Sequence, residues 1–456
     1  MLDTFSLADT RWNAGIHIVG PARRMPSGGF VYMDPAALAD DVRAGLVALT
    51  RQQWRAARSW AKEHETDGAV VVVGDVLPLT FARWACAPLR YAFVGCAKSE
   101  HYVRDASCAG FDCREKFDQA RLRFPERGLE ALSAGIFRGV YLPWEVALIG
   151  ARACVLAAPR DDLTAETLRG QVPRVWRGKV LALGNPMMDF CDAGSREARE
   201  EADRRLTVAV EAAPGLSNHK RAGVSKSHKQ CATRCVVLLP GTRWPEARAN
   251  MVLLLKAAAE AQARCSPHGA PNVALLAPLP PVFDCAKAIE VAECAGWKLL
   301  ERTSTSTSAE NIVLRRGGWR LLLGGDITFA ASLRRAERGL CMAGTATEQF
   351  VGLGKVAHTL ECGAGPQFTP AFAEAQVRLL GGESVRLAPD PAAAGADLAA
   401  ALAASRTETE ARAKMAAANG RARMGAPGGA TRIAEALKHE LALCASVPSK
   451  VDESPV

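Results

Sequence analysis

Short apolar runs alternate with longer amphipathic stretches along most of the chain. The runs are uniformly apolar, which predicts parallel strands that are buried on both faces of a sheet. Strands that alternate with helices are typical of an α/β domain. A long helix is expected over residues 35–61, and the strands of the first half are expected at residues 16–19, 70–73, 91–94, 140–142, 154–157 and 180–183.

A second series of apolar runs follows a change in composition. Residues 191–234 are charged and then rich in Gly, Ser, Lys and His, which predicts a helix followed by a linker. The later strands are expected at residues 236–239, 273–276, 312–314, 321–323, 340–343 and 355–360. The predicted fold is α/β, with two Rossmann-like domains that face each other across a cleft. Their expected extents are 1–190 and 235–388, followed by Ala-rich helices over 389–444 and a disordered tail over 445–456.

Composition is typical of a soluble enzyme, with 49% hydrophobic and 23% charged residues among 456. No run of 18 apolar residues occurs, so no transmembrane helix is expected. The fourteen cysteines are scattered, mostly in apolar surroundings, and no secretory signal is visible at Met1. We therefore expect free, buried thiols in a reducing compartment.

The net charge of +9 favours an anionic partner such as a nucleotide, a phosphorylated substrate, an anionic membrane surface or nucleic acid. Solubility alone is an equally good explanation. Part of the excess lies in residues 220–234, which have the composition of a solvated linker. No basic face interleaved with aromatic residues is visible, so nucleic acid is not an expected partner.

Ligands of doubly wound sheets bind beyond the carboxyl ends of the strands, so the loops after strands carry the most information. In the most informative loop, a strand ends at Gly344-Thr345-Ala346-Thr347 and a helix with Glu348 follows. The free N–H groups and partial positive charge of a helix N-terminus bind phosphate. A carboxylate one turn further on is placed to accept hydrogen bonds from a ribose. An ordinary capped helix is the alternative.

Two other loops of the second domain are candidates for the same ligand. The strand over 236–239 ends in Pro240-Gly241-Thr242-Arg243, and a planar arginine fork suits a diphosphate. Its alternative role is an ion pair with Glu246. The loop over 363–369 contains Gln367, and a plain turn before a capped helix explains it equally well.

The first domain offers polar residues at its own strand ends. Asp75 follows the strand over 70–73 and is interpreted as a general base or as a helix cap. Lys98 follows the next strand, and Asn185 lies where the chain should cross to the second domain. Gly28 and Gly29 belong to a glycine-rich loop with aromatic neighbours, which suits an acceptor or lipid pocket.

His228, Cys231 and Cys235 have roughly the spacing of zinc ligands. No second ligand pair lies nearby in the sequence, and Cys235 begins an expected strand. A metal site is therefore not expected here.

Eight segments carry a family resemblance: residues 26–34, 73–78, 93–100, 141–145, 184–189, 239–243, 342–349 and 365–369. In this order they resemble lipid-A-disaccharide synthase, and more closely the lipid-A-disaccharide synthase-related proteins of cyanobacteria and plastid-bearing lineages. The similarity covers roughly residues 15–440. Each segment is a weak signal alone, but eight in register are fairly specific.

The resemblance implies a GT-B fold and metal-independent, inverting transfer of an acylated glucosamine-type sugar from a UDP donor to a glycolipid acceptor. It implies no cofactor. Arg243 and the turn of Gly344, Thr345, Ala346 and Thr347 would contact the diphosphate, Glu348 the ribose, and Gln367 the donor. Asp75 matches the family's proposed catalytic aspartate and would accept the proton of the acceptor hydroxyl. The helix dipole and Arg243 would stabilise the departing UDP.

The chain departs from this family at its start. Family members have a strand and a glycine-rich loop before residue 16, so the first domain is expected to be truncated or remodelled there. The expected place is the cytoplasm or plastid stroma, peripherally at a membrane surface, with a homodimer left open. The main alternative is a catalytically inactive GT-B protein that binds a nucleotide-sugar or lipid. A UDP-sugar 2-epimerase shares the fold, but no convincing His/Glu cluster is present in the first domain.

Overall fold

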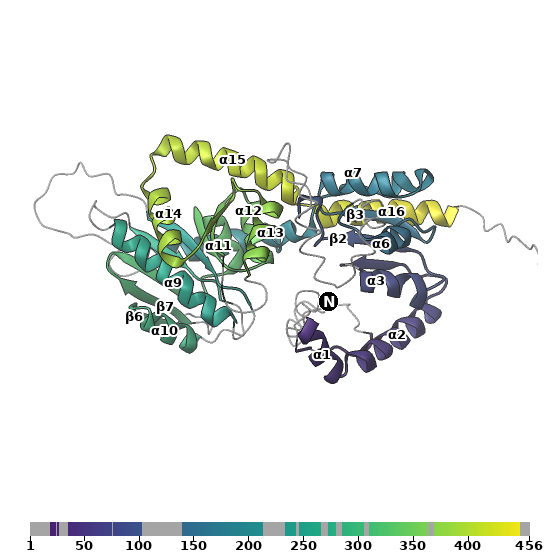
Figure 1. Cartoon of the computed structure of the whole chain (residues 1–456), viewed down its shortest axis with the longest axis horizontal. Coiled ribbons are helices and arrows are strands. Elements are labelled where there is room, and N and C mark those ends of the chain that lie inside the picture. Colours follow the sequence, from purple (N-terminus) through teal and green to yellow (C-terminus); the bar gives the residue numbers. More distant parts are fainter. Residues whose placement is uncertain are drawn as a thin grey trace, which may run out of the picture. The chain divides into compact units, whose positions relative to one another are not determined.

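The computed structural model describes residues 19–23, 25–26, 35–74, 76–102, 139–212, 233–242, 246–265, 272–279, 285–304, 310–361, 363 and 369–446. The chain forms two compact units (Figure 1). Unit 1 is Met1–Pro186 with Gly428–Val456, and unit 2 is Met187–Pro427. Each is built on parallel strands with helices between them, which confirms the predicted α/β class.

Unit 1 contains a three-stranded parallel sheet in the order β1-β2-β3. Its strands are β1 (Val70–Val73), β2 (Tyr91–Gly95) and β3 (Cys154–Pro159). The other elements are α1 (Pro35–Arg43), α2 (Leu46–Glu63), α3 (Val76–Thr80), η1 (Phe81–Ala85), η2 (Glu100–Tyr102), α6 (Pro143–Ile149), α7 (Asp162–Gln171), η3 (Arg174–Lys179) and α16 (Gly429–Ser446).

The two faces of this sheet are covered by parts of the chain that are far apart in sequence. On one face, Phe93 packs with Leu79 of α3, Ile149 of α6 and Leu168 of α7. The other face is covered by α16, drawn in yellow in Figure 1, whose Ile433 packs against the strands. With both faces covered, β2 and β3 are buried along their whole length. This burial explains why their sequences are continuous apolar runs.

Two expected strands of unit 1 are not strands. Residues 140–142 form a bend that leads into α6, since Pro143 starts the helix and Leu142 is its N-cap. The Glu145 carboxylate accepts a hydrogen bond from the Leu142 amide at 2.8 Å and completes this helix start. Of residues 180–183, only Val180 forms an isolated bridge, with Ala157.

The helix expected over residues 35–61 is two helices, α1 and α2. The break falls at Ala44 and Gly45, and Gly45 has φ 97°, a left-handed conformation that ends the first helix. The sequence pattern is amphipathic on both sides of the break, so it predicted one continuous helix. The strand expected at residues 16–19 lies outside the described residues except for Val19, which is exposed and not in a strand.

Unit 2 contains an eight-stranded sheet in the order β11-β10-β9-β4-β5-β8-β7-β6. Its six parallel strands, numbered by their order in the chain, read 6-5-4-1-2-3, which is the strand order of a doubly wound Rossmann sheet. The strands are β4 (Arg234–Leu239), β5 (Val273–Leu276), β6 (Lys298–Ser304), β7 (Glu310–Arg316), β8 (Trp319–Gly324), β9 (Arg338–Cys341), β10 (Val356–Leu360) and β11 (Val385–Ala388).

Helices cover both faces of this sheet. One face packs against α9, α10 and α14, and the other against α8 and α11. The helical elements are η4 (Pro186–Asp192), α8 (Arg196–Ala212), α9 (Glu246–Cys265), α10 (Cys285–Cys294), α11 (Phe329–Arg335), α12 (Thr345–Gly352), α13 (Pro370–Leu380), α14 (Pro391–Ala403) and α15 (Arg406–Met424). Within the described parts of the chain, no helix has the length and apolarity to cross a membrane.

One edge of the sheet in unit 2 departs from the parallel arrangement of the other strands. Strands β6, β7 and β8 pair antiparallel. The β7–β8 connection is Gly317-Gly318, and Gly317 has φ 54°, as a two-residue hairpin turn requires. So short a connection cannot make the crossover that parallel strands need.

Candidate functional site

The two central strands of unit 2, β4 and β9, lie side by side, and the chain leaves them in opposite directions. From β4 it continues through α9 to β5, and from β9 it continues through α12 to β10 on the other side. Their carboxyl ends are in register, with Leu239 opposite Cys341, and the Met342 amide donates to the Leu239 carbonyl at 2.8 Å. A ligand crevice forms at such a point because the two loops diverge from neighbouring strand ends.

The loop after β4 is held by a buried amide. Asn250 of α9 is 1% exposed, and its Nδ2 donates to the Pro240 carbonyl at 3.1 Å. Gly241 follows with φ 99°, a conformation that side chains rarely adopt. A Cβ at Gly241 would lie 3.7 Å from the Met342 carbonyl oxygen, so the two loops run close together here.

The loop after β9 is fixed through one carbonyl. The Ala343 oxygen accepts from the Thr347 hydroxyl at 2.6 Å and from Nε2 of Gln376, on α13, at 3.2 Å. Thr347 is fully buried and Gln376 is 4% exposed. Because both donors are shielded from water, they fix the loop before any ligand arrives.

The start of α12 leaves donors available. Gly344 is the N-cap and provides no side chain, while its carbonyl accepts from the amides of Thr347 and Glu348. The amides of Thr345 and Ala346 have no hydrogen-bond acceptor among the described residues. A helix start with open N–H groups and no side-chain cap is suited to an anion.

The structure therefore gives different roles to the residues of the predicted Gly344–Thr347 turn. Gly344, Thr345 and Ala346 form the helix start, and Glu348 is half-buried in the first turn. The Thr347 hydroxyl is used inside the protein. Two further predicted residues, Arg243 and Gln367, lie outside the described residues.

Sequence reasoning missed Asn250 and Gln376, which position the two loops. A signal existed for Asn250, because it lies in the buried stripe of α9 beside Ala247 and Met251. A single amide in an apolar stripe needs a hydrogen-bond partner, and a strand-end loop is a common one.

The different roles of Thr345 and Thr347 lead to a prediction. Thr347→Val keeps the shape of the side chain and removes its hydroxyl, so we expect the free energy of unfolding to fall by about 0.5–1.5 kcal/mol. The same change at exposed Thr345 should stay within about 0.5 kcal/mol. Urea unfolding of both variants measures this, and equal effects at the two positions would contradict the role given to Thr347.

In unit 1, the predicted site residue Lys98 forms an ion pair with Glu145 of the same unit. Its Nζ lies 2.6 and 2.7 Å from the two carboxylate oxygens of Glu145, whose side chain is fully buried. The ammonium also lies 5.7 Å from the centre of the Tyr141 ring. Lys98 thus neutralises a buried carboxylate at the carboxyl end of β2, and its side chain is 26% exposed.

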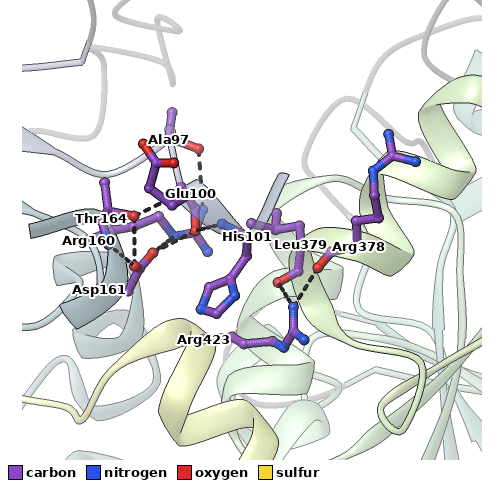
Figure 2. Close-up of polar contacts among 10 residues, drawn as sticks. Ala97, Glu100, His101, Arg160, Asp161, Thr164, Arg378, Leu379 and Arg423 are labelled. Atoms are coloured by element: carbon purple, nitrogen blue, oxygen red, sulfur yellow. Dashed lines mark hydrogen bonds and ion pairs between the residues drawn. The ribbon is translucent and has the colours of Figure 1, made fainter. Parts of the chain in front are cut away.

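A buried polar network joins the loop after β2 to the start of α7 (Figure 2). The Asp161 carboxylate accepts from the Ser99 hydroxyl at 2.6 Å and from the amide and hydroxyl of Thr164 at 2.8 and 2.6 Å. The Glu100 amide donates to the Thr164 hydroxyl at 2.9 Å. Arg160, which is 1% exposed, reaches the Ala97 carbonyl. This network fixes the strand-end loop that carries Lys98.

Of the remaining predicted residues of unit 1, only Asn185 lies within the described part of the chain. Asn185 is fully buried at the end of the unit's first segment. Asp75, Gly28 and Gly29 lie outside the described residues, although β1 ends directly before Gly74 and Asp75. Gly95 at the end of β2 is required for packing, since a Cβ there would lie 2.2 Å from the Tyr141 hydroxyl.

The described cysteines are free thiols, as predicted. Cys235 is the second residue of β4 and is 1% exposed, and burial raises its pKa to about 11. His228 and Cys231 lie outside the described residues. Over the described ranges, no three His, Cys, Asp or Glu side chains gather as a metal site would need.

No protein-family model and no curated protein matches the chain. Among solved structures, it is similar to a UDP-bound MnaA of S. aureus, with 14% identity, coverage of 89% of this chain and 84% of that one, and a TM-score of 0.48. It is also similar to a putative UDP-N-acetylglucosamine 2-epimerase from Listeria monocytogenes, with 13% identity, coverage of 87% of this chain and 79% of that one, and a TM-score of 0.47. A third similar structure is a UDP-forming α,α-trehalose-phosphate synthase from Burkholderia vietnamiensis, with 14% identity, coverage of 85% of this chain and 78% of that one, and a TM-score of 0.38. At such values, the Rossmann assignment rests on the strand order of unit 2.

Proposed function

We propose that the chain is a GT-B sugar-nucleotide enzyme whose unit 2 binds the UDP part of a donor at the carboxyl ends of β4 and β9. One observation carries this proposal: the uncapped start of α12 lies at the point where the strand order reverses. Its two open amides are suited to phosphate oxygens, because backbone N–H groups and the helix dipole both favour negative charge.

We further propose the activity that the family resemblance implies, which is inverting transfer of an acylated glucosamine-type sugar to a glycolipid acceptor. In this proposal, Arg243 and the amides of Thr345 and Ala346 hold the diphosphate, and Glu348 accepts hydrogen bonds from the ribose. These groups stabilise the negative charge that grows on UDP as the sugar leaves. Asp75 accepts the proton of the attacking hydroxyl, while Gln367 contacts the donor.

Calorimetric titration with UDP, without added metal, tests the binding step. We expect micromolar binding by the unmodified chain and a loss of roughly tenfold or more in Arg243→Ala and in Glu348→Ala, since each removes charge-assisted hydrogen bonds. Arg248→Ala is the matched control, because Arg248 is exposed on α9 and pairs with Glu290.

Three outcomes separate the possibilities. Weakened binding in both site variants but not in Arg248→Ala supports the proposed nucleotide site. Absence of UDP binding by the folded chain overturns it. UDP binding with no sugar transfer from any of a panel of acylated and simple UDP-sugars, and no hydrolysis of them, overturns the transferase activity and leaves a nucleotide-binding protein.

A further inference from the structure

A polar cavity lies at the opposite end of the same sheet from the candidate nucleotide site. It is lined by charged or titratable side chains from five elements of unit 2 and from the turn before β11: Arg338, His358, Glu383, Arg386, Asp397 and Arg412. Arg338 is the first residue of β9, so the cavity lies toward the amino ends of the strands. The nucleotide loop follows the carboxyl end of β9, so the two sites are distinct.

Cations outnumber anions in this cavity. Three arginines, Arg338, Arg386 and Arg412, face two carboxylates, Glu383 and Asp397. Among the described residues, Arg386 and Arg412 form no hydrogen bond or ion pair within the protein, although both lie near enough to Asp397 to lower its pKa. Arginine forks that the protein leaves unused are suited to oxyanions, which accept two hydrogen bonds from each fork.

Arg338 makes this excess of positive charge costly. The residue is 4% exposed, and its Nη1 donates to the Glu337 carbonyl at 3.0 Å. Burial, and then the neighbouring Arg234, lower its pKa. A buried guanidinium without a carboxylate at ion-pair distance is unfavourable, and a bound anion relieves this cost.

His358 adds an unused polar atom. The side chain is 2% exposed, and its Nδ1 lies 2.9 Å from a carboxylate oxygen of Asp397. Burial lowers the pKa of His358, while the hydrogen bond from the ring lowers the pKa of Asp397. The neutral ring therefore donates from Nδ1 to the ionised carboxylate, and Nε2 carries a lone pair. This buried Nε2 has no hydrogen-bond partner among the described residues.

We propose that this cavity is a binding site for a small dianionic oxyanion, namely the phosphate group of a small metabolite or free inorganic phosphate. Arg338, Arg386 and Arg412 neutralise the anion, and His358 donates to it from Nε2. Because Nε2 of the neutral ring holds a lone pair, an anion without a proton of its own, such as sulfate or a phosphate monoester dianion, binds with uptake of a proton by the imidazole. The Asp397 carboxylate on Nδ1 and the bound dianion stabilise the resulting imidazolium against Arg338 and Arg386.

Calorimetric titration of the full chain with sulfate at neutral pH tests both the binding of the anion and the uptake of a proton, since sulfate does not itself titrate there. Running the titration in two buffers with different ionisation enthalpies reports the protons taken up. We expect saturable binding with proton uptake by the unmodified chain. The double variant Arg386→Ala/Arg412→Ala should bind at least about tenfold more weakly, because two charge-assisted contacts are lost.

The remaining variants separate binding from proton uptake and from general loss of charge. His358→Gln should bind more weakly and without proton uptake. Arg264→Ala is the control for loss of an exposed arginine outside the cavity, because Arg264 is exposed on α9 and pairs with Glu260. Competition by inorganic phosphate and by glycerol phosphate shows which source of the phosphate group binds better. Arg386 and Arg412 are both exposed, so the double variant should fold as the unmodified chain does.

Three results would overturn the proposal. The first is absence of saturable sulfate binding by the unmodified chain. The second is equal binding by the double variant and by Arg264→Ala. The third is loss of sulfate binding in Arg243→Ala but not in the double variant, which would place the anion at the nucleotide loop. The outcome does not depend on whether UDP binds.

Discussion

Replacing Asp75 with asparagine is expected to lower the rate of sugar transfer by roughly 10²–10⁴-fold and to leave UDP binding unchanged. Asparagine has nearly the same shape but cannot accept a proton from the acceptor hydroxyl. In the sequence, Asp75 comes two residues after the end of β1, and ligands of parallel α/β domains bind beyond the carboxyl ends of the strands. Release of UDP from an acylated UDP-sugar in the presence of a glycolipid acceptor gives the rate.

Asp67→Asn provides the matched control for this experiment. Asp67 precedes β1, and its side chain is 73% exposed, so the same substitution there should change neither transfer nor UDP binding. Transfer by Asp75→Asn at the rate of the unmodified chain would exclude Asp75 as the general base. Loss of UDP binding in Asp75→Asn would instead indicate that this residue supports the donor site.

Gly395→Ala is expected to lower the free energy of unfolding by about 1–3 kcal/mol, although alanine is the better helix former. Gly395 lies in α14, where that helix packs closely against α9. An added Cβ would lie 2.6 Å from the Ala257 carbonyl oxygen and 3.0 Å from the Ala261 amide nitrogen. These are backbone atoms of α9, so the two helices would have to separate. Hydrogen exchange of α9 and α14, with a thermal unfolding curve, measures the effect.

Gly170→Ala tests whether that loss comes from the helix contact. Gly170 lies in α7, is exposed, and has no atom within 4 Å of an added Cβ among the described residues. The same substitution should therefore raise stability, by up to about 1 kcal/mol, because alanine loses less backbone entropy in a helix than glycine. Similar effects of the two substitutions would disprove the close α9–α14 contact.

The sequence predicted those parts of the fold that depend on continuous apolar runs. The runs over 70–73 and 273–276 are β1 and β5 with the expected bounds. β5 is buried along its whole length, as a continuous apolar run predicts, whereas Val71 and Val73 of β1 are 49% and 55% exposed. The antiparallel pairing of β7 with β8 was missed although Gly317-Gly318 is a hairpin signal. An apolar run alone does not show the direction in which a strand pairs.

The candidate nucleotide site was predicted in part. The glycine turn at residue 344 and the helix that carries Glu348 are visible in the sequence because they are local. The sequence does not show that the loop after β4 lies beside them, nor that Asn250 and Gln376 hold the two loops. Those facts depend on a strand order in which β4 and β9 are neighbours, although about a hundred residues separate them in the chain.

The cavity proposed to bind an oxyanion was not predictable from the sequence. Arg338, His358, Arg386, Asp397 and Arg412 belong to five different elements, and none forms a motif with its neighbours in the chain. By itself, the sequence determined the α/β class, the strand-end loops and the helix starts, since apolar periodicity and capping act over a few residues. Only the tertiary structure decided which strands are neighbours and which charges share a cavity, because packing brings together residues that the chain keeps far apart.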